Sequence, residues 1–180
     1  MTDRAGSPIV WFTGRPAAGK STLAAALRPT LQAIWPVEIL DGDQVRHWLS
    51  DDLGFSRPDR DRNIARIAHV ACLLAHNGVA VIVAAVSPYA AARAQARALA
   101  TNQAIPFFEI FVSAPLAVLA QRDPKGMYRQ AQAGQIPNFT GVSDPYEDPE
   151  HPDLMIHTDA ESVAASADRA VASLRARGLL

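Results

Sequence analysis

Short runs of apolar and β-branched residues alternate along this chain with longer alanine-rich stretches of helical periodicity. The apolar runs are the expected strands, at 9–13, 37–40, 79–86, 107–112 and 154–157. Each run is apolar nearly throughout, which is typical of strands buried on both faces of a sheet. Strands that alternate with helices favour a parallel sheet covered by helices on both sides. The predicted fold class is therefore α/β, with five parallel strands.

The clearest helical pattern covers residues 58–77. Ser56 is the expected N-cap, Pro58 suits the first turn, and Gly78 stops the helix. The positions expected to face the core recur at helical spacing and are Ile64, Ile67, Ala68, Ala71 and Leu74. The pattern predicts a helix that covers one face of the sheet.

Apolar periodicity fades between residues 122 and 152, where proline and glycine interrupt a polar segment with aromatic residues. A long excursion of this kind in a compact domain is typical of a functional lid. No internal repeat, low-complexity tract or linker divides the 180 residues. We therefore predict one domain over residues 1–180, with a mobile lid over about 122–152.

Charge and composition limit the kinds of partner that the protein is expected to bind. A formal net charge of −1, with arginines dispersed among acids, creates no basic patch for nucleic acid or an anionic membrane. The single cysteine, Cys72, can form neither an internal disulfide nor a metal cluster. The start, MTDRAGSP, lacks a signal peptide's apolar segment, and no later run is long enough to cross a bilayer. We expect a cytoplasmic protein whose partners are small molecules.

Residues 14–21 read GRPAAGKS, the G-x-x-x-x-G-K-[ST] pattern of a phosphate-binding loop. The backbone N–H groups of such a loop surround nucleotide phosphates, Lys20 places a charge against their oxygens, and Ser21 can bind Mg²⁺. The pattern can also arise by chance as a glycine-bearing turn, but its place between a strand and a helix indicates a nucleotide binder. The loop geometry is unusual, because Pro16 lacks an N–H and Ala17 has a side chain where a loop of this kind often has glycine.

Asp41 and Asp43 follow the expected strand 37–40, and Arg46 lies just beyond them. In open parallel sheets, ligands bind beyond the carboxyl ends of the strands, so these side chains would face the loop 14–21. The carboxylates could orient Mg²⁺ or accept a proton from a hydroxyl nucleophile. The alternative is a turn in which Asp43 caps the next helix, a role that can coexist with catalysis.

Further polar groups follow other strands. Arg60, Asn63 and Arg66 recur at i, i+3 and i+6, so one helix face could present them to an anion, although on spacing alone a solvated face is the commoner interpretation. Ser87 follows the expected strand 79–86 and would face the phosphates, although a Ser-Pro after a strand is by itself most often a helix start. Phe139 in the lid could stack on a base or pin the loop to the core.

Taken together, these motifs resemble those of adenylylsulfate kinases. The likeness runs from Trp11 to about Asp159 through GRPAAGKST, LDGDQVR, DLGFSRPDRDRNIAR, VSPYAAAR and RDPKGMYRQAQAGQIPNFTGVSDPYEDPEHPDL. The resemblance implies a P-loop NTPase fold, Mg²⁺ as cofactor and a possible homodimer. The implied reaction transfers the γ-phosphoryl group of ATP to the ribose 3′-hydroxyl of adenosine 5′-phosphosulfate.

The resemblance also implies the residues of the site. Those of the ATP site are Gly14, Arg15, Pro16, Ala17, Ala18, Gly19, Lys20, Ser21, Thr22 and Arg122. Those of the phosphosulfate substrate are Asp43, Arg46, Phe55, Arg60, Asn63, Val86, Ser87, Lys125, Asn138 and Phe139. The two phenylalanines would sandwich its adenine, and the two arginines with Asn63 would hold its phosphosulfate.

The predicted mechanism is in-line attack by the 3′-hydroxyl, because phosphoryl transfer depends mainly on positioning and electrostatics. Asp43 is the candidate orienting base, Lys20 and Lys125 stabilise the transferring charge, and Ser21 with Asp41 holds Mg²⁺. Family descriptions also assign a phosphoserine to the Ser87 position, which leaves a two-step route open.

Two other functions remain as alternatives. One is a small-molecule P-loop kinase with a different hydroxyl acceptor, and the other is a nucleotide-sensing module without catalysis. The chain also departs from the usual family pattern, which has Glu, Arg, Asp, Cys and Glu where it carries Arg62, Ala90, Ser113, Leu119 and Ala120. The charge reversal at Arg62 predicts an altered affinity for the phosphosulfate group.

Overall fold

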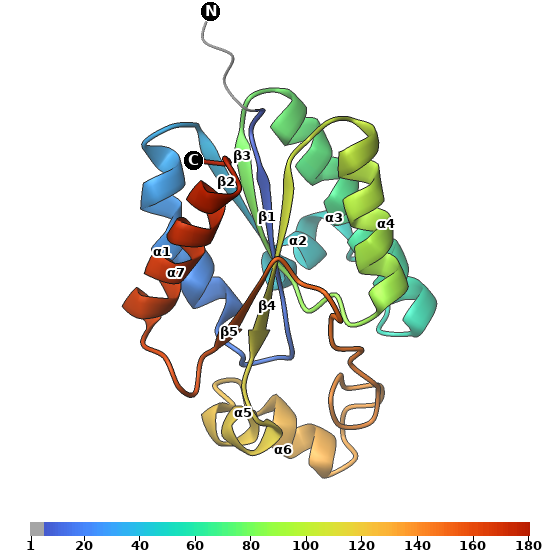
Figure 1. The fold of residues 1–180 in the computed structure, drawn as a ribbon. Helices are drawn as coiled ribbons and strands as arrows, with labels where there is room; N and C mark the ends of the chain where they lie inside the picture. Colours follow the sequence, from blue (N-terminus) through green and yellow to red (C-terminus); the bar gives the residue numbers. More distant parts are fainter. Residues whose placement is uncertain (1–5) are drawn as a thin grey trace, which may run out of the picture.

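A computed structural model describes residues 6–180, so the first five residues of the MTDRAGSP start lie outside it. At its centre is a five-stranded parallel sheet in the order β2-β3-β1-β4-β5 (Figure 1). The strands are β1 (Ile9–Thr13), β2 (Val37–Asp41), β3 (Ala80–Ala84), β4 (Phe107–Ser113) and β5 (Leu154–His157). The predicted α/β class with five parallel strands is confirmed.

The predicted strand 79–86 is too long at its carboxyl end, because β3 stops at Ala84. The Ala85 N–H still bonds to the Phe12 carbonyl, but the chain then turns through Ser87, whose φ is 39°. This left-handed conformation is uncommon for a residue with a side chain. The turn ends the regular hydrogen-bond ladder and places Ser87 just beyond the carboxyl end of β3.

Helices cover both faces of the sheet (Figure 1). On one face lie α1 (Lys20–Gln32) and α7 (Val163–Ala176), and on the other lie α3 (Arg57–His76) and α4 (Ala90–Asn102). Three shorter helices, α2 (Gly42–Leu49), α5 (Leu116–Arg122) and α6 (Met127–Gln132), follow the carboxyl ends of β2 and β4. The side of the molecule beyond the strand ends is therefore built from loops and short helices.

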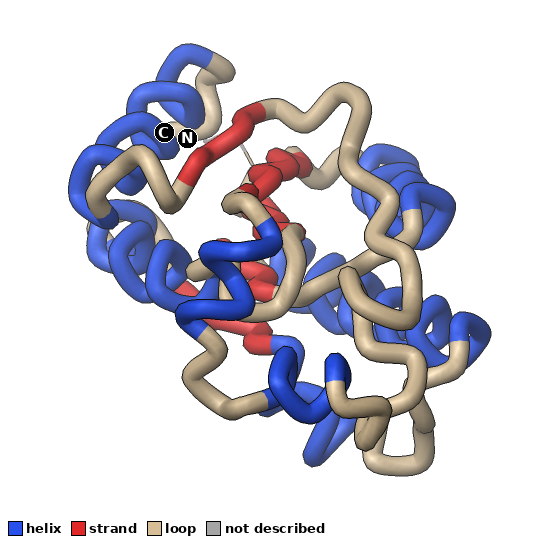
Figure 2. The backbone as a smooth tube through the Cα atoms, turned by 90° about the horizontal axis from the view of Figure 1, so that it is seen from below, coloured by secondary structure: helices blue, strands red, loops and turns tan. Residues whose placement is uncertain are grey.

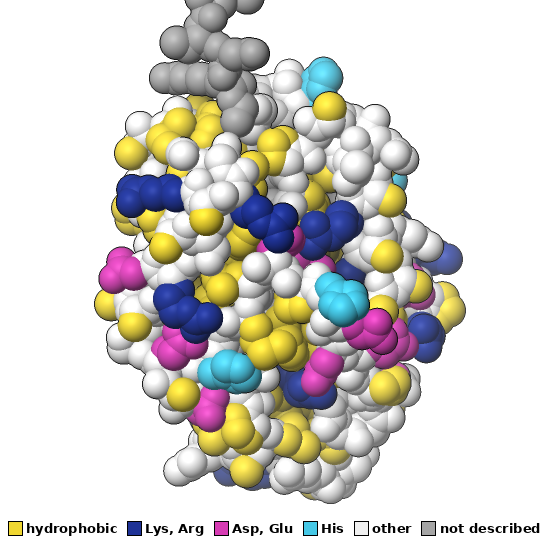
Figure 3. Space-filling view, in the orientation of Figure 1, with side chains coloured by type: hydrophobic (Ala, Val, Ile, Leu, Met, Phe, Trp, Pro, Cys, Tyr) yellow, Lys and Arg dark blue, Asp and Glu magenta, His cyan; other side chains and the backbone are white. Residues whose placement is uncertain are grey.

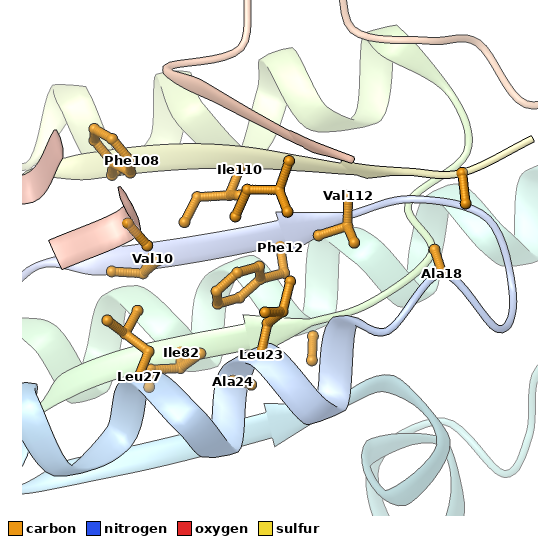
Figure 4. Packing of buried hydrophobic residues seen from close by; sticks show 14 of the residues in the cluster. Val10, Phe12, Ala18, Leu23, Ala24, Leu27, Ile82, Phe108, Ile110 and Val112 are labelled. Atoms are coloured by element: carbon orange, nitrogen blue, oxygen red, sulfur yellow. The ribbon is translucent and has the colours of Figure 1, made fainter. Parts of the chain in front are cut away.

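Two buried clusters explain why the strands are apolar nearly throughout. Alternate residues of β1 point to opposite faces. Val10 and Phe12 pack in the cluster that contains residues of α1 (Figure 4). Trp11 packs in the cluster that contains residues of α3. The Ser56 hydroxyl caps α3 by accepting from the Asp59 N–H at 3.3 Å, as predicted. Of the predicted core face of α3, only Leu74 is not fully buried, and it packs against the second cluster.

The lid segment is more regular than its sequence indicated. Fading apolar periodicity hid α6, which begins after Gly126. The carboxylate of Asp123 accepts from the N–H groups of Tyr128 and Arg129 at 3.0 and 3.1 Å and so satisfies the start of this helix. Tyr128, 1% exposed, donates its hydroxyl to the Pro16 carbonyl at 3.0 Å. The lid is thereby fastened to the phosphate-binding loop.

Surface charge shows the same dispersion as the sequence. On the face shown in Figure 3, acidic and basic side chains are intermixed, and the described atoms form no continuous basic patch there. Within residues 6–180, no helix is both long enough and apolar enough to pass through a membrane. Cys72 is buried in the core.

Candidate active site

A cavity of about 800 Å³ lies beyond the carboxyl ends of the strands. Figure 2 views the molecule from this side, where loops and short helices lie in front of the strand ends. Most of the predicted site residues line the cavity: Pro16, Ala17, Gly19, Lys20, Ser21, Thr22, Asp41, Asp43, Arg46, Phe55, Arg60, Asn63, Val86, Ser87, Arg122, Lys125, Asn138 and Phe139. Gly14, Arg15 and Ala18 do not line it, and the Arg15 side chain instead pairs with Asp148 at 3.0 Å. One cavity thus collects side chains that are far apart in the sequence.

The backbone of the phosphate-binding loop depends on residues that tolerate unusual conformations. At Gly14, whose φ is 152°, an added Cβ would lie 2.2 Å from the Val112 carbonyl oxygen, so only glycine fits. Ala17 adopts a φ of 62°. This left-handed conformation at a non-glycine residue is the unusual geometry that the sequence predicted. The loop ends at Gly19, the N-cap of α1.

Lys20 points its ammonium group into this loop. The side chain is 8% exposed, and Nζ donates to the carbonyl oxygens of Gly14 and Arg15 at 2.8 Å each. Burial lowers the pKa of Lys20 to about 8, although the carboxylates of Asp43 and Asp41 oppose this shift. A phosphate group against Nζ would restore the charged form.

Nucleotide binding is therefore expected to take up a proton at mildly alkaline pH. At pH 8 about half of the Lys20 amines are neutral without nucleotide, and phosphate raises their pKa, so uptake approaches ~0.5 proton per site. At pH 6.5 Lys20 is already protonated, and uptake from this group vanishes. Titration calorimetry of Mg·ATP in buffers of different ionisation enthalpy measures this difference. Lys125→Ala should retain the uptake, and equal uptake at the two pH values would contradict the assignment.

Ser21 and Asp41 lie side by side at the edge of the loop. The Ser21 hydroxyl donates to Asp41 Oδ2 at 2.5 Å, and Asp41 Oδ1 accepts from the Asp43 N–H at 3.0 Å. Asp41, not Asp43, is therefore the N-cap of α2, which corrects the alternative considered from the sequence. A hydroxyl and a carboxylate suit Mg²⁺, which usually keeps several waters and takes its other ligands from phosphates.

Asp43 and Lys125 meet across the mouth of the cavity. The Lys125 ammonium donates to the Asp43 carboxylate, and both side chains are mostly exposed. The hydrogen bond and charge of Asp43 raise the pKa of Lys125, which stays protonated at neutral pH. Two predicted catalytic groups, one on α2 and one in the lid, are therefore neighbours.

Phe55 lies among guanidinium groups on the α2 and α3 side of the cavity. Its ring is half exposed, and the Cζ atoms of Arg46 and Arg60 lie 4.4 and 5.5 Å from its centroid. Arg46 donates to the carbonyls of Leu53 and Gly54, and Arg60 donates to those of Phe55 and Asn138. These bonds fix both guanidiniums at the cavity wall.

Arg66 does not join this group, so the shared anion-binding face, which spacing alone made the less common interpretation, is wrong for this residue. Its guanidinium forms a two-pronged pair with Asp52 at 2.5 and 2.8 Å and donates to the Leu49 carbonyl. Six residues advance a helix by about one and two-thirds turns, so Arg66 lies on a different face of α3 from Arg60.

Two lining residues are buried although they face the cavity. Asn63 is 7% exposed, and its Oδ1 has no hydrogen-bond partner among the described residues. Phe139 is 4% exposed and packs edge-on against Tyr128, with ring centroids 5.0 Å apart and planes at 82°. A buried unpaired amide oxygen is costly, so Asn63 is poised for a donor on a ligand.

Ser87 is held by bonds within the protein. The residue is 1% exposed, and its hydroxyl accepts from Trp11 Nε1 at 3.1 Å and donates to Thr13 Oγ1 at 2.9 Å. Thr13 Oγ1 in turn lies 2.8 Å from the Tyr146 hydroxyl. The serine hydroxyl thus belongs to a buried polar chain behind the cavity wall.

Four residues at the opposite end of the cavity were not predicted from the sequence. Thr158, Glu161, Val163 and Ser166 line this end, and the Ser166 hydroxyl and Glu161 Oε2 are buried without partners among the described residues. The predicted Arg122 belongs to this end, where it donates to the Thr158 hydroxyl and carbonyl at 2.8 and 2.7 Å. The only available signal was their position after the last strand, since strand ends in one sheet gather ligands.

Arg62, the charge reversal predicted to alter affinity, is not among the residues that line the cavity. Its guanidinium lies 3.7 Å from the Asp59 carboxylate one turn away. Ala90 is another position at which the chain differs from the usual family pattern. Its backbone N–H donates to the Glu147 carboxylate at 2.7 Å.

The fold and this cavity define a P-loop kinase: a phosphate-binding loop lies at the carboxyl edge of a parallel sheet, and the segment 122–152 brings Arg122 and Lys125 to the cavity. A family model described as adenylylsulphate kinase matches residues 6–157. An adenylyl-sulfate kinase from Myxococcus xanthus is 57% identical over 172 residues, which cover 96% of this chain and 93% of that protein. The chain belongs to the adenylylsulfate kinase family.

Other relatives agree. An adenylyl-sulfate kinase from Chloroflexus aurantiacus is 54% identical over 167 residues, which cover 92% of this chain and 88% of that protein. The solved structure of the APS kinase CysC of Mycobacterium tuberculosis in complex with AMPPNP and APS has a TM-score of 0.90 and 43% identity, covering 94% of this chain and 98% of that one. The function predicted from the motifs, an ATP-dependent adenylylsulfate kinase, is confirmed.

Proposed function

We propose that the chain transfers the γ-phosphoryl group of ATP directly to the 3′-hydroxyl of adenosine 5′-phosphosulfate, with the two substrates at opposite ends of the cavity. The observation that carries this proposal is the position of the phosphate-binding loop after β1, the central strand. The ends of β2 and β3 border the cavity on one side of the loop, and the end of β5 borders it on the other. Two nucleotides can thus approach one loop from opposite sides.

The acceptor end is assigned to the side of β2 and β3. There Arg46 and Arg60 supply planar guanidiniums for a phosphosulfate, and Asn63 Oδ1 lacks a partner among the described residues. Phe55 offers an exposed ring face and Phe139 a buried one. This combination of aromatic surface and fixed donors suits an adenine nucleotide that carries two acidic groups.

The donor end is assigned to the side of β5. The phosphates of ATP would lie against the loop 14–22, with Lys20 at the β and γ oxygens. Its base would lie near Arg122, where the buried Ser166 hydroxyl and Glu161 carboxylate offer hydrogen-bonding groups. Ser21 and Asp41 would hold Mg²⁺, which would neutralise part of the charge of the phosphates.

Asp43 is the proposed orienting base for the 3′-hydroxyl. It lines the cavity between the two ends and is paired with Lys125 of the lid. A hydroxyl bonded to this carboxylate would be directed toward the γ-phosphoryl group, with Lys125 beside the transferring charge. Residues 122–152 act as a lid in this proposal, because the reaction needs water excluded when both substrates are bound.

Direct transfer agrees with the surroundings of Ser87 better than a phosphoserine route does. The Ser87 hydroxyl already donates to Thr13 Oγ1, and Ser87 is 1% exposed, so the hydroxyl is not free to attack a phosphoryl group. Ser87→Ala is expected to keep turnover within about tenfold, while stability falls by about 1–3 kcal/mol because Trp11 Nε1 loses its acceptor. Initial rates and thermal melting measure the two effects. Transfer of a labelled phosphoryl group from ATP to the wild-type protein, in the absence of acceptor, would overturn the direct route.

The proposed reaction is tested by ADP release with Mg²⁺ and ATP, in the presence and absence of adenosine 5′-phosphosulfate. Strong dependence on this acceptor, and none on adenosine 5′-phosphate, is expected because the sulfate completes the anion that the guanidiniums bind. Dependence on a different hydroxyl compound would support the other small-molecule kinase. ATP binding without ADP under any condition would support the sensing module. Cytoplasmic residence and a homodimer stay predictions, the latter testable by light scattering.

A further inference from the structure

Arg93 on α4 is a buried cation that the mechanism above does not use. The residue is 4% exposed. It is the last residue of the motif VSPYAAAR, whose first residues line the cavity. Burying a guanidinium is costly unless its donors and charge are satisfied. Such a group is therefore expected to hold specific partners.

All sides of the Arg93 guanidinium are occupied. Nη1 donates to the Ser87 carbonyl at 2.8 Å, and Nη2 donates to the Glu147 carbonyl at 2.7 Å. Nε lies 3.2 Å from Glu109 Oε1 on β4, in an ion pair without hydrogen-bond geometry. The ring of Tyr146 lies 5.7 Å from its Cζ atom. One side chain thus joins two backbone segments that are far apart in sequence.

The two carbonyls belong to segments that carry the acceptor end of the cavity. Ser87 lines the cavity in a left-handed conformation, which persists only if neighbouring groups hold it. Glu147 follows Asp144, which lies 3.8 Å from Arg60 and accepts from the Tyr89 hydroxyl at 2.6 Å. The position of Arg60, a proposed phosphosulfate contact, therefore depends on the segment that Arg93 holds.

We propose that Arg93 is a positioning residue for the acceptor substrate, which fixes the Ser87 turn and the Asp144 segment relative to each other. Lysine is a poor replacement, because its three N–H donors share one nitrogen, whereas the guanidinium spreads its donors over three nitrogens that face separate partners. The inference rests on the proposed function, since it concerns the acceptor of that reaction.

The same helix supplies a matched control one turn later. Arg97 shares Glu109, at 3.3 Å, and pairs with Asp153 at 2.7 Å. It contacts neither the Ser87 nor the Glu147 carbonyl. Arg97→Lys therefore perturbs the same charge network without releasing the two cavity segments.

The test compares Arg93→Lys with Arg97→Lys in the full chain. Arg93→Lys is expected to raise KM for adenosine 5′-phosphosulfate by at least about tenfold, the loss of a charged hydrogen bond, with the Kd of an ATP analogue within about twofold of wild type. Arg97→Lys should leave both constants within about twofold. Equal acceptor KM values in the two variants, or parallel weakening of both substrates, would overturn the proposal.

A second variant covers the case in which Arg93→Lys does not fold. Glu109→Gln keeps both carbonyl bonds available and removes only the carboxylate that orients the guanidinium. It should show the same selective rise in acceptor KM at smaller size, and an equal change in both substrates would overturn the proposal. A wild-type protein without acceptor-dependent ADP release would instead refute the proposed function.

Discussion

Replacing Lys20 by Met is expected to lower kcat/KM by about a hundred- to a thousandfold, the range found when one pre-arranged donor to a transferring group is lost. Lys20 is the cation of the phosphate-binding loop, and its ammonium sits between the Gly14 and Arg15 carbonyls, where no other cationic side chain of the described chain reaches. Acceptor-dependent ADP release by the purified variant measures the loss.

The fold should survive this substitution. Burial lowers the pKa of Lys20 from 10.5 to about 8, so below pH 8 the folded protein carries a buried charge that costs stability. Stability rises as the pH passes from about 8 to 10.5, because in this window the unfolded chain binds the proton and the folded protein does not. Lys20→Met removes this desolvation cost and should melt at or above wild type at pH 7 without nucleotide. A folded variant that kept more than about a tenth of wild-type turnover would refute the role of the loop.

Phe139→Ala is expected to have the largest effect on stability among the site residues. The ring is 4% exposed and belongs to the cluster that contains Phe12 and Leu23, so its loss should cost about 3–5 kcal/mol. For a chain of this length, that corresponds to a fall in Tm of roughly 6–20 °C. Differential scanning calorimetry measures the fall.

Phe55→Ala is the matched control, because Phe55 is 54% exposed and lines the same cavity. It should leave Tm within about 2 °C, since a half-exposed side chain contributes little to stability. The KM for adenosine 5′-phosphosulfate should rise by about tenfold or more as one stacking face is lost. An unchanged Tm in Phe139→Ala would show that this residue is not a pin for the lid. An unchanged acceptor KM in Phe55→Ala would remove it from the substrate site.

Local signals explain what could be predicted from the sequence. The loop 14–21 is continuous in the chain, and each residue's role follows from its place in a strand-loop-helix unit. Asp41 and Ser87 were found because they follow apolar strands, and parallel strand ends meet at one edge. These inferences need only strand position, which apolar runs indicate well.

Errors arose where the answer depended on geometry beyond that position. Arg66 was grouped with Arg60 by spacing, but the rotation of α3 directs it to Asp52. Helix α6 was not predicted, because its residues show no clear apolar periodicity. Its N-terminus is satisfied by the carboxylate of Asp123, four residues before its start, which is not a usual capping position. Ser166 lines the cavity from α7, which packs on α1, a long-range contact that no local pattern indicates.

The two lysines of the cavity are also the only lysines of the chain, since every other basic side chain apart from histidine is arginine. Amine-directed acylating reagents therefore have just two side-chain targets, Lys20 and Lys125, besides the amino terminus. The lowered pKa of Lys20 makes it partly neutral at pH 8 and so nucleophilic, whereas Lys125 stays protonated beside Asp43. Acylation of either lysine side chain, whether by a labelling reagent or in a cell, would therefore modify the cavity itself, and the amino terminus is the one amine whose labelling would leave both lysines intact.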